Sequence, residues 1–202
     1  FWSEFCDWNL EMSKIAIYRG DATAKAQAQA VLVKVLNETL RLLHPFIPFV
    51  TEETWGYLKQ AAGDETWPAG LIVASWPEPG PRDEAAEAEM SLVMDIVRAI
   101  RNARAEYDVK PGQLIAAEIS AGDRAGQLQA QAEVLCSLAR LDPARLLIAA
   151  HLDAPAQALT LVTGAVSIYL PLADLVDLAA ERSKLQKELA ETEAQTARSE
   201  NL

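Results

Sequence analysis

Three arginines at three-residue spacing, Arg98, Arg101 and Arg104, are the side chains best arranged for chemistry in this sequence. Apolar residues recur at helical spacing around them. We therefore predict a helix from whose core face Arg98 and Arg101 point well away, while Arg104 borders it. A stripe of guanidinium groups can bind RNA phosphates or dock against another domain. An ordinary solvated face, with ion pairs to Asp95 and Glu106, explains the spacing equally well.

The other reactive side chains form no catalytic or metal-binding pattern. His44 and His151 lie far apart, with no cysteine or acidic residue at metal-ligand spacing. For Cys6 and Cys136, a disulfide or a shared metal is one alternative, and two buried free thiols are the one we expect. We therefore predict no catalytic residue, no metal and no cofactor within this chain.

The charge of the chain limits what it can bind alone. Its 202 residues carry a formal net charge of −11, whereas phosphate binding needs lysine and arginine. Residues 61–95 hold eight acidic residues and one basic residue, a net −7, in a proline-rich stretch that can stay solvated. No apolar run approaches the roughly 18 residues that span a bilayer, so we expect no membrane partner and a cytoplasmic location.

Two helices are predicted in the first part of the chain. Residues 1 to about 18 place Trp2, Phe5 and Trp8 at helical spacing, where they either stack on bases or, as we expect, fill a helical core. No capping residue precedes them, so we expect a piece of a longer protein. Residues 28–43 repeat the apolar spacing and predict the second helix.

The segment from His44 to Trp55 predicts a tight helical corner. Pro45 should end the second helix by disfavouring the α conformation at His44, whose imidazole can meet the last carbonyls. Thr51, followed by two glutamates, predicts the N-cap of a third helix that runs to about Ala62. We expect the aromatic residues to pack into the corner between the helices.

The second half predicts a mixed module. Prolines and glycines make residues 63–82 a connector, and residues 84–107 are the helix that carries the arginines. Leu114–Ser120 and Arg145–Leu152 predict strands on either side of a helix at about 124–141. Leu159–Leu170 predicts a hairpin that turns at Thr163-Gly164. The predicted fold class is α+β, mainly α, with a helical bundle, a small α+β module and a terminal helix.

The terminal helix carries a heptad pattern that is apolar early and polar late. Its proposed seam consists of Leu178, Arg182, Leu185, Leu189, Thr192 and Thr196. One helix cannot bury such a seam alone, so we expect the first arm of a coiled coil. We divide the chain at residues 1–82, 83–171 and 172–202.

Five segments, in order along the chain, carry a resemblance to a known family. They are Phe1–Trp8, His44–Trp55, Ala74–Glu78, Ile100–Glu106 and Val109–Gly112. Together they resemble the anticodon-binding region of class I aminoacyl-tRNA synthetases, and the segments after the corner favour the valine-specific members, the valyl-tRNA synthetases. The resemblance implies an anticodon-binding helical domain in residues 1–82 and a C-terminal coiled coil that begins in residues 172–202.

The resemblance also implies where RNA binds. In this family the helix similar to residues 1–14 lies near the anticodon, which makes Asn9, Glu11 and Lys14 candidate contacts. The coiled coil reaches the outer corner of tRNA, where its basic side chains meet the backbone. The candidates there are Arg182, Lys184, Lys187 and Arg198, beside Arg98 and Arg101 on the earlier helix.

A synthetase of this family ligates valine to its tRNA with ATP, and we expect that activity in the parent enzyme, a monomer. The nucleotide-binding signatures of the class are not present here, and Met12-Ser13-Lys14 is only a partial echo of one. We therefore expect this chain to bind valine tRNA weakly, together with the rest of the synthetase. The competing hypothesis is a self-associating interaction scaffold with no RNA binding of its own.

Overall fold

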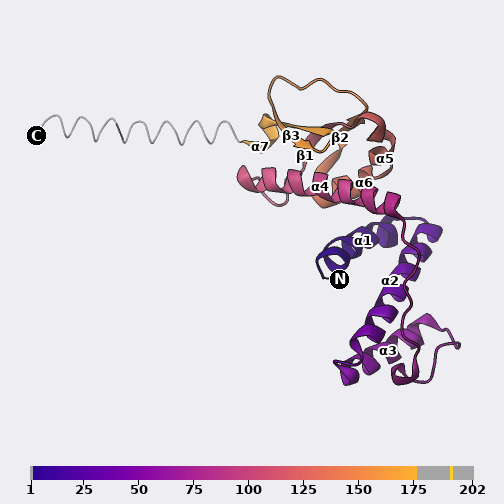
Figure 1. The fold of residues 1–202 in the computed structure, drawn as a ribbon. Helices are drawn as coiled ribbons and strands as arrows, with labels where there is room; N and C mark the ends of the chain where they lie inside the picture. The colour runs from indigo at the N-terminus through magenta and orange to yellow at the C-terminus, as the bar shows by residue number, and fades with distance from the viewer. Residues whose placement is uncertain (1, 177–191, 193–202) are drawn as a thin grey trace, which may run out of the picture. The chain divides into compact units, whose positions relative to one another are not determined.

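The computed structural model describes residues 2–176 and 192 of the chain. The chain divides into two units, Phe1–Asp83 and Glu84–Leu202, and each has its own buried core (Figure 1). Among the described residues, no helix combines the length and apolar character needed to cross a membrane. The terminal heptad seam and the basic tail lie outside the described residues, except for Thr192.

The first unit is helical. A π-helical segment, η1 (Trp2–Asn9), continues into α1 (Leu10–Arg19), and α2 (Ala22–Leu43) follows after a turn. Asp21 caps α2 by accepting a hydrogen bond from the Ala24 amide at 2.8 Å. After the corner come α3 (Pro48–Ala62) and a short 3₁₀ turn, η2 (Leu71–Val73). Gly63 ends α3 with a φ of 62°, a left-handed conformation that favours glycine.

The core of this unit forms around Trp55, whose exposed fraction is 1%. Leu40 and Leu71 are buried against it, and the Trp67 ring stacks on it with centroids 5.4 Å apart. The indole N–H donates to the Asn37 side-chain oxygen at 2.8 Å. Since Leu71 and Trp67 belong to the predicted connector, that segment is part of the core and not merely a solvated link.

The aromatic residues of the first helix divide between core and solvent. Trp8 is buried, as predicted, and Phe5 is partly buried. Trp2, in contrast, is 77% exposed, so the expectation that all three fill the core is wrong for this residue.

The corner corrects three expectations. The helix α2 ends at Leu43 as predicted, but His44 keeps α-helical angles (φ −54°, ψ −40°). The next helix begins at Pro48, whose fixed φ suits the first helical turn, so Thr51 lies inside α3 and is not its N-cap. Trp55 is buried as expected, but Phe46 and Phe49 are 80% and 89% exposed, so these two aromatic side chains of the corner are not buried.

The second unit is a four-stranded sheet with helices packed against it. The strands β1 (Ile115–Ser120), β2 (Leu141–Ala149), β3 (Ala158–Thr163) and β4 (Val166–Pro171) lie in the order β2-β1-β4-β3. The pair β1–β2 is parallel, and the other two pairs are antiparallel. The connection from β1 to β2 carries η3 (Gly122–Arg124), α5 (Ala125–Ala130) and α6 (Ala132–Ala139).

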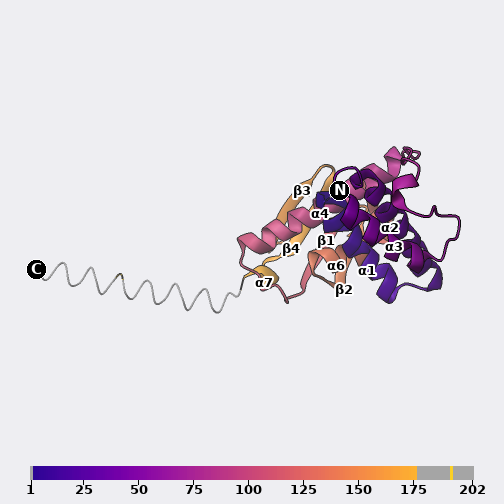
Figure 2. The ribbon, with the colours of Figure 1, turned by 90° about the horizontal axis from the view of Figure 1, so that it is seen from below.

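The core of this unit lies between the sheet and its helices. The long helix α4 (Glu84–Glu106) contacts α6 and β3, and α6 contacts β2. Figures 1 and 2 show α4 and α6 on the same side of the sheet. Ile96 and Ile100 of α4 are fully buried, as are Ile119 of β1 and Ile168 of β4. The fold class is therefore confirmed as mainly α, with a small sheet.

Four local predictions differ from the structure in the second unit. The helix expected at about 124–141 is interrupted at Gln131, and β2 begins at Leu141 instead of Arg145. The predicted hairpin is present, but its turn is Gly164-Ala165, because Thr163 pairs with Val166. Gly164 takes a φ of 59°, which a tight hairpin turn needs at its first central position. Leu114 precedes β1, and a last short helix, α7 (Leu172–Leu175), follows β4.

Candidate nucleic-acid interface

The three arginines of α4 have different surroundings. Arg98 is exposed and pairs with Asp95, with 2.8 Å between Nη1 and Oδ1. Arg101 is also exposed, but its Nε donates to the carbonyl oxygen of Leu138 at 2.9 Å, which attaches it to the C-terminal end of α6. Both side chains therefore lie off the core face, as the spacing predicts, but Arg101 is attached to α6 by this hydrogen bond, whereas Arg98 pairs within its own helix.

Arg104 is a structural cation. Its side chain is buried, and its guanidinium donates to the carbonyl oxygens of Lys110 at 3.1 Å, Gln113 at 2.8 Å and Arg140 at 3.4 Å. Burial, and then the charge of Arg140, lowers the pKa of Arg104, yet arginine remains protonated in proteins. The interaction fastens the chain after α4 to the end of α6.

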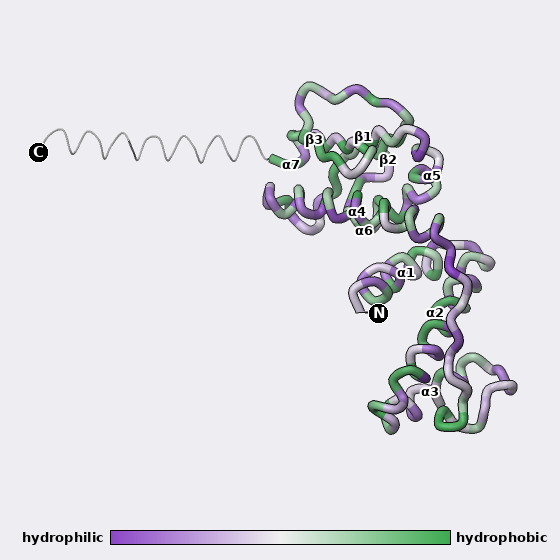
Figure 3. The backbone as a smooth tube through the Cα atoms, in the orientation of Figure 1, coloured by the Kyte–Doolittle hydropathy of each residue, from purple (hydrophilic) through white to green (hydrophobic). Residues whose placement is uncertain are grey.

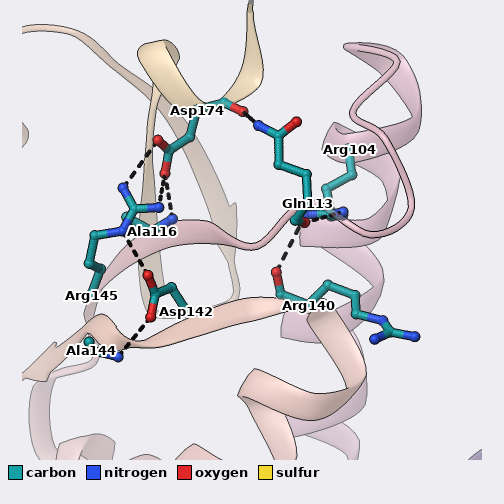
Figure 4. A network of polar contacts seen from close by, with 8 residues as sticks. All are labelled: Arg104, Gln113, Ala116, Arg140, Asp142, Ala144, Arg145 and Asp174. Carbon is teal, nitrogen blue, oxygen red and sulfur yellow. Dashed lines mark hydrogen bonds and ion pairs between the residues drawn. The ribbon is translucent and has the colours of Figure 1, made fainter.

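A second polar network joins three distant parts of this unit (Figure 4). Arg145 pairs with both carboxylate oxygens of Asp174, at 3.2 and 3.0 Å, and its Nε donates to Asp142 at 3.0 Å. Asp174 also accepts the Ala116 amide hydrogen at 2.7 Å. Its own carbonyl accepts from the Gln113 side chain at 2.8 Å, so α7 is bound to β1 and β2 at several points.

The candidate RNA contacts of the first unit are the polar side chains of Asn9, Glu11 and Lys14. Glu11 and Lys14 form an ion pair on the exposed surface of α1, and the Asn9 side-chain oxygen accepts from Ser13 Oγ at 3.4 Å. These three residues lie together, as their spacing predicts. They belong to the first unit, whereas Arg98 and Arg101 belong to the second.

The histidines and cysteines of the described residues form no shared site. His44 Nδ1 lies 2.9 Å from the Thr51 hydroxyl, instead of meeting helix carbonyls, and His151 is exposed beside Asp153. Both cysteines are free thiols, but only Cys136 is buried, and burial raises its pKa. Within residues 2–176 and 192, no group of three or more histidine, cysteine, aspartate or glutamate side chains could hold a metal ion.

Sequence reasoning missed the network of Asp142, Arg145 and Asp174. No local signal could have identified it, because Arg145 and Asp174 are 29 residues apart and only the sheet brings them together. Arg104 carried a signal, since its position at the border of the core face indicated partial burial. The candidates Arg182, Lys184, Lys187 and Arg198 lie outside the described residues.

Comparison with known proteins identifies the family. Residues 1–119 match the model of the anticodon-binding domain of tRNA ligase, which covers the first unit and continues through α4 into β1. The chain is 42% identical to a valine–tRNA ligase of Syntrophotalea carbinolica over 196 residues, which is 95% of this chain and 21% of the relative. It is 45% identical to the valine–tRNA ligase of Geobacter sulfurreducens over 193 residues, 93% of this chain and 21% of the relative.

A third valine–tRNA ligase is similar over nearly the same length of this chain. The valine–tRNA ligase of Geobacillus stearothermophilus is 39% identical over 196 residues, 93% of this chain. The chain spans about a fifth of the length of these curated relatives, 21% in each case. The match to the domain model covers more than half of the chain and agrees with the helical first unit described above. The chain therefore belongs to the anticodon-binding domain family of tRNA ligases.

Proposed function

We propose that this chain is the tRNA-binding region of a valyl-tRNA synthetase. It holds the tRNA while other parts of the enzyme ligate valine to that tRNA with ATP, and it contains neither the catalytic nor the editing site. The observation that carries the proposal is the match of residues 1–119 to the anticodon-binding domain, together with the similarity of 93–95% of the chain to valine–tRNA ligases.

The described surface supports two points of contact with RNA. Lys14 and Arg98 each sit in an exposed ion pair, with Glu11 and Asp95 respectively. Such pairs contribute only about 0–1 kcal/mol, so a phosphate can replace the carboxylate at little cost. Asn9 offers an amide beside Lys14, and exposed Trp2 offers a ring face to an unpaired base.

The net charge of −11 predicts that two such contacts give weak binding. We assign further contacts with the tRNA backbone to the cations Arg182, Lys184, Lys187 and Arg198, which lie outside the described residues. Arg101 and Arg104 support the surface indirectly, because their bonds to backbone carbonyls fix the position of α4.

The test is binding of labelled valine tRNA, measured by fluorescence anisotropy at low and moderate salt. The chain is compared with a longer chain from the same gene that restores its flanks on both sides. Binding that is weak for the first and tight for the second supports the proposal. No binding by either at low salt overturns it, and a stable dimer by light scattering in that case identifies an interaction scaffold.

A matched pair of double variants locates the contact. Lys14→Ala with Arg98→Ala removes the proposed cations, and Lys25→Ala with Arg124→Ala removes the same charge from exposed positions in the same two units. The first variant should weaken binding by about tenfold. It should also reduce the slope of log affinity against log salt concentration by the amount expected for the loss of roughly two phosphate contacts. Equal weakening by both variants would mean that only the overall charge matters.

A further inference from the structure

The corner between α2 and α3 carries a cluster of exposed apolar side chains. This corner patch consists of Leu42, Leu43, Phe46, Ile47, Phe49 and Val50, with exposed fractions of 44%, 41%, 80%, 47%, 89% and 65%. In Figure 3 the tube is largely hydrophobic through this corner. Several large apolar side chains that are exposed within a short segment of this kind can mark an interaction site.

The backbone beneath the corner patch is held in place by hydrogen bonds. The Phe46 and Ile47 amides donate to the Leu43 carbonyl at 3.0 and 3.1 Å. The Thr51 hydroxyl, which is buried, donates to the carbonyl oxygen of Ile47 at 2.9 Å and lies 2.9 Å from His44 Nδ1. These hydrogen bonds fix the backbone of the corner in a conformation in which the rings of Phe46 and Phe49 are exposed.

The chemistry of the corner patch fits a protein surface and not RNA. Residues 42–50 contain no lysine, arginine, aspartate or glutamate, so a phosphate backbone finds no cation there. The adjacent Arg41 bonds to the Asn37 side chain at 3.2 Å and to the Ser75 carbonyl at 3.2 Å. His44 faces Thr51 and Glu52 within the unit.

We propose that the corner patch docks against another part of the same synthetase chain, outside these 202 residues. The relatives of this chain are about five times as long, since it spans 21% of each, which leaves ample chain to cover the patch. Interfaces between domains of one chain are built from such partly apolar surfaces. The inference rests on family membership and does not depend on tRNA binding.

Hydroxyl-radical footprinting without tRNA tests the proposal. The oxidation rates of Phe46 and Phe49 are measured in this chain and in the complete synthetase chain that contains it, at concentrations where light scattering shows monomers. The expected result is at least an approximately tenfold slower oxidation of both rings in the complete chain. Equal rates in the two chains overturn the proposal.

Two other results also overturn it. Protection that appears in this chain alone as its concentration rises, with the mass of a dimer, assigns the corner patch to a second copy. Protection of the complete chain that appears only when tRNA is added assigns it to RNA. Because the measurement is made without tRNA, a failed tRNA-binding test leaves its outcome unaffected.

A variant pair supplies an independent readout. Phe46→Ser with Phe49→Ser should leave the melting temperature of this chain unchanged, because both rings are exposed, but should lower that of the complete chain. Val162→Ser changes a side chain that is 70% exposed in the second unit and serves as the control. A complete chain whose melting temperature does not respond to the double variant argues against docking at the corner patch.

Discussion

Arg104 places a buried guanidinium group in the last turn of α4, and its hydrogen bonds explain why this buried charge is stable. Removing a cation from water is costly unless its donors find acceptors, and here three backbone carbonyls accept from it. The same carbonyls would lack this partner if the side chain were apolar. The residue therefore acts as a fastener between α4, the following turn and the end of α6.

We predict that Arg104→Met destabilises the second unit by about 3 kcal/mol, because it leaves buried carbonyls without their charged donor. The five tryptophans, at positions 2, 8, 55, 67 and 76, all belong to the first unit, so their fluorescence reports that unit alone. In urea, the fluorescence transition should stay, and the part of the circular-dichroism change that the fluorescence does not follow should move to lower urea concentration. Arg98→Met is the exposed control and should change stability by no more than about 1 kcal/mol.

Trp55 is the corresponding anchor of the first unit. We predict that Trp55→Ala destabilises it by about 3–5 kcal/mol, because the change removes a ring that packs on Leu40, Leu71 and Trp67. Trp55→Phe keeps an aromatic ring and loses the hydrogen bond to Asn37, so its effect should be near 1 kcal/mol. Urea unfolding followed by the remaining tryptophans measures both, and an unchanged midpoint for the alanine variant would contradict the anchor role.

At the scale of elements, the irregular pairing of β1 with β2 explains the polar network. The register moves from Ile115↔Leu141 to Ala117↔Leu146, so residues 142–145 bulge out of the ladder. Pro143, which has no amide hydrogen, is tolerated in such a bulge. The amide of Ala116 donates to Asp174, and Arg145 projects from the bulge to the same carboxylate.

This bulge should make the second unit sensitive to acid through Asp142. The Ala144 amide and then Arg145 lower the pKa of Asp142 from its ordinary value of 3.8. A carboxylate whose pKa is lower when folded stabilises the fold above that ordinary value, and the contribution disappears as pH falls through the lowered pKa. We predict that Asp142→Asn lowers the urea midpoint measured by circular dichroism at neutral pH and has little effect at strongly acid pH.

The first unit provides a control for this pH dependence. The Thr66 side chain, and then its amide, lowers the pKa of Asp64, and this carboxylate lies in the unit that the tryptophans report. Asp142→Asn should therefore leave the pH dependence of the fluorescence transition unchanged. The same difference between wild type and variant at every pH would show that the bulge is stabilised by something other than the ionised carboxylate.

Sequence patterns predicted the elements of this chain better than their ends and contacts. Helical spacing located α4, and alternation with a glycine turn located the β3–β4 hairpin, because both patterns are local. The N-cap was misplaced because Thr51 and Pro48 give competing local signals, and the structure uses the proline. The ion pair of Arg145 with Asp174 depends on strand register, which no local pattern encodes.

The candidate site was predictable only in part, for a related reason. The spacing of Arg98, Arg101 and Arg104 identified the stripe, but which arginine meets a carbonyl depends on where α6 ends. The rings of Phe46 and Phe49 were expected in the core because apolar residues between two helices suggest one, and the structure leaves both rings exposed.

At the scale of the whole molecule, two electrostatic effects act on the proposed tRNA binding. The net acidic charge repels RNA, and a few local cations attract it. A chain of net charge −11 repels a polyanion at long range, so affinity must come from a few local cations whose contribution falls with salt. In the described part, Lys14 and Arg98 are the proposed contacts. The tail adds three cations close together at Arg182, Lys184 and Lys187, which makes it the stronger test of the RNA-binding proposal.

We predict that replacing Arg182, Lys184 and Lys187 together with alanine in the complete synthetase raises the KM for tRNA and flattens its salt dependence. Each phosphate contact that is lost should reduce the slope of log affinity against log salt by about 0.9 for duplex-like RNA. The KM for valine should stay unchanged, because the proposed contact is with tRNA and not with the amino acid. Aminoacylation assays at several salt concentrations measure both constants, and Lys25→Ala with Arg124→Ala and Arg140→Ala removes equal charge elsewhere. A variant that matches wild type across the salt series would show that the tail does not contact tRNA.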